Sequence, residues 1–272
     1  MINQMNWTKI SQGITGAAAL MLLSSVANAQ VAGSAHDLSV IVGSQTNEVC
    51  VYCHTPHGAD ISAVVPLWNK TLPGSTYQRY SDLNTSTLDG AEAAVGSVSL
   101  ACLSCHDGSQ AMDNVINAPG RGMNSGAIGT VGFMTGTPVP MLGTDLRDDH
   151  PISIQYAGGG PTAANADGVY AGTLGDPDFT PPTKATINTN PAWWVDSEAT
   201  PDGIRQRTDM ILYTRADAPA GPGDARQPFV ECGSCHDPHN SSTFNGTAPN
   251  LSVGFLRIPN TNSDICTACH LK

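Results

Sequence analysis

The chain contains the stretch Cys50-Val51-Tyr52-Cys53-His54, in which two cysteines three positions apart are followed directly by a histidine. The same pattern recurs three times, and its four copies together use all 8 cysteines of the 272-residue chain. The other copies are Cys102-Leu103-Ser104-Cys105-His106, Cys232-Gly233-Ser234-Cys235-His236 and Cys266-Thr267-Ala268-Cys269-His270. The meaning of this pattern therefore decides the interpretation of the whole chain.

The pattern is the attachment signature of c-type haem. Two thiols at this spacing can form thioether bonds with the two vinyl groups on one edge of the porphyrin, and the adjacent histidine then lies beneath the iron as its proximal ligand. The sequence predicts four covalently attached haem c groups. They are expected to be held by Cys50, Cys53, Cys102, Cys105, Cys232, Cys235, Cys266 and Cys269, with His54, His106, His236 and His270 as proximal ligands.

Two other interpretations of the cysteines stay open at this point. An exported protein often carries a disulfide framework, and paired CxxC units can bind zinc. A disulfide framework leaves the histidine after every cysteine pair unexplained, so haem attachment is the preferred prediction.

The number of histidines supports this interpretation. The chain has 8 histidines, and the four outside the motifs are His36, His57, His150 and His239. An iron with two imidazole ligands needs one further histidine per haem, so we predict that these four are the distal ligands. A methionine could replace a distal histidine and raise the potential of that haem. The candidates downstream of residue 29 are Met112, Met123, Met134, Met141 and Met210.

His57 and His239 each follow a proximal histidine by three residues. Three extended residues reach at most about 10 Å, which is too short to carry the chain around a porphyrin to the opposite face of the same iron. Each is therefore predicted to bind a different haem from its neighbour, the alternative being an exposed histidine beside a haem. His36 and His150 are lone histidines, for which an ordinary loop position is the alternative, although a carboxylate beside His150 could orient its ring.

Composition predicts a loop-rich fold with few short helices and little regular secondary structure, in which either much of the chain is disordered or something besides side chains fills the interior. Gly 28 and Pro 19 interrupt helices, while aromatic residues make up 6% and charged residues 13% of the chain, so side chains alone provide little core. Short helices are expected around each motif and over 88–103, and loops over 181–191 and 218–228. The pair Trp193-Trp194 is expected to pack against a haem or a partner, or else in an ordinary core.

Residues 1–29 are predicted to be a secretory signal peptide. Lys9 is followed by an apolar run and then by Ala27-Asn28-Ala29, a small-residue cleavage site; a transmembrane anchor is the alternative, but the run is short for a bilayer. Residues 30–272 would form one tetrahaem domain that is exported to the cell surface or beyond, with the periplasm as the alternative. The net charge of −11 disfavours nucleic acid as a partner, and no further hydrophobic span is present.

Several stretches together resemble the extracellular tetrahaem c-type cytochromes of metal-respiring bacteria, the OmcE type, some of which polymerise into haem-chain filaments (cytochrome nanowires). They are Ala35-His36-Asp37-Leu38-Ser39, residues 50–58, Pro66-Leu67-Trp68-Asn69-Lys70, residues 101–108, Gly143-Thr144-Asp145-Leu146, Asp149-His150-Pro151-Ile152-Ser153, residues 230–240 and Phe255-Leu256-Arg257. The resemblance implies a loop-rich fold around a continuous haem stack. It also implies a homopolymer in which His57 ligates the third haem of an adjacent subunit, with His239 on the fourth haem and His36 and His150 on the first two.

These predictions point to electron transfer rather than catalysis, because an iron with two histidines has no open position for a substrate. We expect a filament subunit that delivers respiratory electrons to redox partner proteins or external acceptors. The alternatives are a periplasmic or surface electron shuttle that does not polymerise and a multihaem reductase with one five-coordinate haem.

Overall fold

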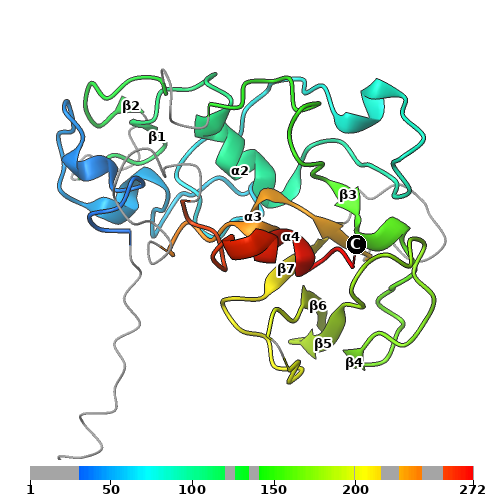
Figure 1. Cartoon of the computed structure of the whole chain (residues 1–272). Coiled ribbons are helices and arrows are strands. Elements are labelled where there is room, and N and C mark those ends of the chain that lie inside the picture. Colours follow the sequence, from blue (N-terminus) through cyan, green and yellow to red (C-terminus); the bar gives the residue numbers. More distant parts are fainter. Residues whose placement is uncertain are drawn as a thin grey trace, which may run out of the picture.

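Six strands of this protein form one antiparallel sheet in the order β3-β8-β7-β6-β5-β4, and β1 pairs with β2 in a separate two-stranded ribbon (Figure 1). The computed structural model describes residues 31–119, 126–134, 141–198, 200–215, 227–240 and 254–271, so the predicted signal peptide lies outside the described residues. The strands are β1 Asn114–Val115, β2 Gly126–Ala127, β3 Ile154–Gln155, β4 Gly168–Val169, β5 Thr183–Ile187, β6 Asn190–Val195, β7 Met210–Thr214 and β8 Pro228–Val230.

Helices are short, and the described α-helices lie at CxxCH motifs. The α-helices are α2 Ser97–His106, α3 Cys232–Cys235 and α4 Asp264–Thr267, and the 3-10 turns are η1 Leu38–Val40, η2 Val49–Tyr52, η3 Tyr80–Leu83, η4 Tyr156–Gly158 and η7 Thr261–Ser263. The prediction of a short helix around each motif is confirmed, by η2, α2, α3 and α4 in turn. The helix expected over 88–103 begins only at Ser97, because Gly96 is its extended N-cap residue.

The predicted fold class is wrong, because the described chain is rich in β-structure rather than loop-rich. The six-stranded sheet lies within 154–230, and the predicted loop over 181–191 contains β5 and the start of β6. The predicted loop over 218–228 lies mostly outside the described residues. Pro191 is tolerated in β6 because β6 pairs with β7 only from Trp193 onward. At position 191 the β7 side of β6 has no partner strand, so the missing backbone N–H of proline removes no hydrogen bond between these strands.

Apolar side chains stabilise this sheet locally. Trp193 opposes Leu212 and Val195 opposes Met210 across β6 and β7, and cross-strand pairs of this kind stabilise sheets. Trp193 and its neighbour Trp194 are each 1% exposed. Trp193 belongs to a core cluster that also receives Cys269 of the fourth motif at its edge. The ordinary-core alternative for this tryptophan is therefore confirmed, and composition averaged over the chain had concealed a compact side-chain core.

The three α-helices lie in the middle of the molecule, between the β1–β2 ribbon and strands β4 to β7 (Figure 1). Among the described residues, no helix is both long enough and apolar enough to cross a bilayer.

Candidate haem-binding sites

The four motifs are neighbours in space in the same order as in the sequence. The thiols of Cys102 and Cys232, in the second and third motifs, share a hydrogen bond that raises the pKa of Cys102. Their helices are joined where the backbone N–H of Cys232 donates to Ser99 Oγ at 3.0 Å. Cys53 and Cys105 lie close enough for the charge of one to raise the pKa of the other, and the same holds for Cys235 and Cys266. The attachment points therefore form a continuous series.

Three of the motifs are anchored by the same backbone device. A residue far away in the sequence forms a single antiparallel bridge with each proximal histidine: His54 with Trp68, His236 with Leu256, and His270 with Phe179. The residue that follows each bridge partner donates its backbone N–H to the carbonyl of the motif's second cysteine. These hydrogen bonds join Asn69 to Cys53 at 2.8 Å, Arg257 to Cys235 at 2.8 Å and Thr180 to Cys269 at 2.9 Å. The bridge fixes the backbone from which each imidazole projects.

The second motif is held differently, by its own helix. Cys102, Cys105 and His106 all lie on α2, and the N–H of Leu142 donates to the carbonyl of His106 at 2.7 Å. Leu103 is fully buried, so packing fixes the face of α2 from which the cysteines project.

Histidine rings come together in three pairs, each with one proximal histidine and one histidine outside the motifs. The ring centroids of His36 and His106 are 6.2 Å apart, those of His54 and His239 are 6.1 Å apart, and those of His150 and His270 are 6.4 Å apart. Imidazole–metal bonds are about 2.0–2.1 Å long. Since a ring centroid lies about 1.2 Å from its nitrogens, two imidazoles on opposite sides of one metal have centroids roughly 6.4–6.6 Å apart, within a few tenths of an ångström of the observed values. The three pairs match this separation.

Hydrogen bonds at the other ring nitrogen support a ligand role. Nδ1 of His54 lies 2.9 Å from the carbonyl of Pro66, and Nδ1 of His150 lies 3.0 Å from that of Pro151. Nδ1 of His239 lies 3.5 Å from Asp237 Oδ1. Such partners orient a ligating imidazole and favour the tautomer in which Nε2 carries a lone pair for a metal.

His36 is suited to a metal in another way. Its Nδ1 is buried without a hydrogen-bond partner, which is costly for a polar atom unless a ligand satisfies it. Burial, followed by the charge of His106, lowers the pKa of His36 to about 4. The ring is therefore neutral near pH 7, which is the form that binds iron. On these observations the residues present fit a haem group.

The pairing differs from the one expected. His239 lies beside His54 of the first motif instead of the fourth, and His150 lies beside His270 of the fourth motif instead of one of the first two. His36 faces the second motif, as expected. The position of His239 beside the first motif agrees with the expectation that it does not serve the haem of its own motif.

Two histidines remain after this pairing, His57 and His236. Both are exposed. In the described part of the chain, His236 is not in one of these ring pairs, although His106 lies close enough for its charge to act on the pKa of His236. The His57 ring makes no hydrogen bond or ring contact among the described residues.

The alternative interpretations of the cysteines gain no support. All eight cysteines are free. Within the described ranges, no three His, Cys, Asp or Glu side chains gather as a metal site, whereas structural zinc takes four protein ligands. A haem iron takes four nitrogens from its porphyrin and needs only two from the protein, so paired histidines suffice.

Sequence reasoning missed Phe179. It lies just before the predicted loop over 181–191, yet it forms the bridge to His270 and its ring centroid is 4.4 Å from that imidazole. A useful signal would have been an aromatic or large apolar residue followed by a residue that donates to the motif, as at Trp68 and Leu256. No model of a known protein family matches the chain, and a search of curated proteins finds none that is significantly similar.

Proposed function

We propose that this protein transfers electrons through four covalently attached haem c groups, as a subunit of an extracellular filament that delivers respiratory electrons to external acceptors. The observation that carries the proposal is the set of three histidine pairs at 6.1–6.4 Å, each with one CxxCH histidine. When bound, a haem iron with two axial imidazoles supplies one-electron chemistry at low potential relative to His/Met ligation.

Different residues of the chain would perform different parts of this function. The cysteines tether each group, and the backbone bridges at Trp68, Leu256 and Phe179 hold the proximal imidazoles in place. Each of the three histidine pairs would hold a haem iron between two imidazoles and leave it no open site for a substrate, which favours an electron carrier over an enzyme. The contacts between successive motifs keep the redox centres close, as transfer between them requires.

Haem content tests this proposal. The protein purified from a host with a haem-attachment system is expected to contain four c-type haems per chain by the pyridine haemochrome assay, with low-spin absorption. The physical reason is that each cysteine pair can form two thioether bonds. A colourless product, or a haem count below four, would show that the motifs do not attach haem.

The distal ligands can be tested separately with His150→Ala. This variant is expected to retain four haems, because the cysteines are intact, but one haem in four should become five-coordinate on reduction and bind carbon monoxide. His150 is exposed, so its loss should cost little packing. Carbon monoxide titration of the reduced protein measures the effect against the wild type, which should bind none. An unchanged low-spin spectrum would mean that His150 is not a ligand.

A further inference from the structure

Lys70 is a buried cation between the first two motifs. It is 1% exposed and directly follows Asn69, whose N–H holds the carbonyl of Cys53. Its Nζ lies 2.9 Å from the carbonyl oxygen of Ala111, 3.3 Å from that of Met112 and 2.7 Å from that of Asn114.

This geometry requires the charged form of the side chain. An ammonium group has three N–H donors, whereas a neutral amine has only two, and three carbonyl oxygens surround Nζ. Burial lowers the pKa of Lys70, while Cys105, Cys53 and Asp113 act in the opposite direction. The preceding residue, Asn69, holds Cys53 of the first motif, and Ala111 follows His106 of the second motif by five residues. The charge of Lys70 therefore lies beside the positions where two haems would be attached.

We propose that Lys70 raises the reduction potentials of the haems attached at Cys50/Cys53 and at Cys102/Cys105. The inference rests on the proposed function. A ferric haem carries one more positive charge than a ferrous haem, so a nearby buried cation disfavours the oxidised form. Because burial lowers the effective dielectric constant, the effect is larger than that of a surface lysine.

Two buried carboxylates oppose this charge. Asp113 is 2% exposed and accepts the N–H groups of Val131 and Gly132 at 3.0 and 3.1 Å. Asp107 is 7% exposed and accepts from the hydroxyls of Ser75 and Tyr77. The three carbonyl oxygens around Nζ carry no net charge, and each carboxylate accepts hydrogen bonds from other groups, so the positive charge of Lys70 remains at this position.

The test is a spectroelectrochemical titration of the haem-loaded protein, fitted with four one-electron components. In Lys70→Met, two of the four components are expected to shift to lower potential. Lys184→Met is the matched control, because the Lys184 side chain is 6% exposed and pairs with Asp167 at 3.2 Å. Its Nζ also donates to the carbonyl of Asn165, and neither of these partners belongs to a CxxCH motif, so its titration curve should match the wild type.

Two further variants separate charge from structure. Lys70→Arg retains the positive charge and should restore the wild-type potentials. Asp113→Asn removes an opposing anion while leaving Lys70 in place, so it should shift the same two components to higher potential. If Lys70→Met does not fold, the direction of the shift in Asp113→Asn tests whether buried charge at this position sets the two potentials. Unchanged potentials in folded Lys70→Met, or no upward shift in Asp113→Asn, would overturn the inference. Absence of haem from the wild type would instead overturn the proposed function.

Discussion

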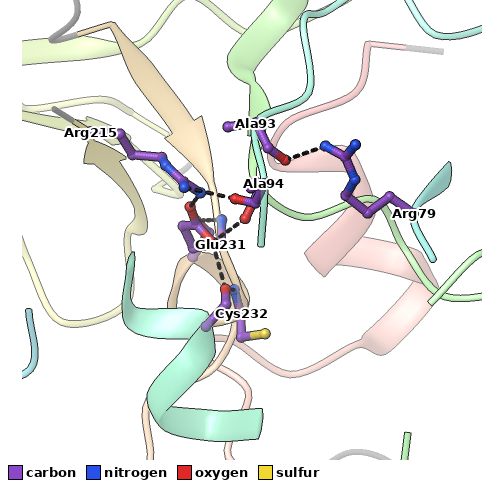
Figure 2. Close-up of polar contacts among 9 residues, drawn as sticks. Arg79, Ala93, Ala94, Arg215, Glu231 and Cys232 are labelled. Atoms are coloured by element: carbon purple, nitrogen blue, oxygen red, sulfur yellow. Dashed lines mark hydrogen bonds and ion pairs between the residues drawn. The ribbon is translucent and has the colours of Figure 1, made fainter. Parts of the chain in front are cut away.

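Replacing Arg215 with methionine is expected to lower the free energy of unfolding by about 3–5 kcal/mol. Nη1 of Arg215 donates to Glu231 Oε1 at 2.9 Å, and the two side chains are 1% and 0% exposed. Nη2 donates to the carbonyl of Ala94 at 2.7 Å, so the guanidinium joins the end of β7 to the segment before α2 (Figure 2). Methionine fills similar space but leaves Glu231 as a buried carboxylate without its cation, which is the costly outcome.

Glu231 makes this pair important for the third motif, because it directly precedes Cys232. Its carboxylate also accepts hydrogen bonds from Ser99 of α2 and, at 3.1 Å, from Ser153. Burial raises the pKa of Glu231, while Ser99 and Arg215 act to lower it. The network thus ties together the second motif, the third motif and the sheet.

Denaturant unfolding followed by circular dichroism measures the effect. Arg147→Met is the control, because its pair with Asp145 at 2.7 Å has side chains 39% and 51% exposed, and exposed pairs contribute little. The double variant Arg215→Met/Glu231→Leu should recover much of the loss, since it leaves no unpaired buried charge. A single variant as stable as the wild type would refute the importance of this ion pair.

Replacing His57 with alanine is expected to abolish filaments while leaving four haems attached to each chain. His57 is exposed, and its backbone is held in place because Asn117 Nδ2 donates to its carbonyl at 2.7 Å. Among the described residues, His236 is the CxxCH histidine that is in no ring pair with a histidine outside the motifs. One surface therefore presents a ligand and another lacks one, so a second copy of the chain can satisfy both.

Negative-stain electron microscopy of the secreted protein measures assembly. The isolated variant should also bind carbon monoxide at one haem per chain, since the third haem would lack its distal ligand. Ile187→Ala is the control, because Ile187 is 46% exposed at the β5–β6 hairpin, away from the motifs, and it should polymerise normally. Filaments of His57→Ala would show that this ligand does not link subunits, and wild-type protein that never polymerises would favour the electron shuttle.

The candidate site was predictable where its chemistry is local. A CxxCH motif needs only five consecutive residues, so Cys50 to His54 and its three copies could be identified without a structure. The short reach from His54 to His57 and from His236 to His239 likewise predicted that neither distal histidine serves its neighbour's iron. The structure agrees with this expectation for His239, whose ring lies beside His54 of the first motif.

The fold was less predictable because strands depend on partners. Glycine and proline counts describe the whole chain, whereas β6 and β7 form because Trp193, Trp194 and Val195 bury against Leu212, Ile211 and Met210. That pairing joins residues far apart in sequence, and tertiary packing overrides average composition.

The sequence by itself determined the number of CxxCH motifs, their proximal histidines and the presence of one further histidine for each, because these depend on residue identity and covalent reach. Only the tertiary structure decided that His239 meets His54, that His150 meets His270 and that Lys70 is buried between two motifs. The physical reason is that these contacts close long loops, and which distant segments meet is set by the packing of the whole chain rather than by any local pattern.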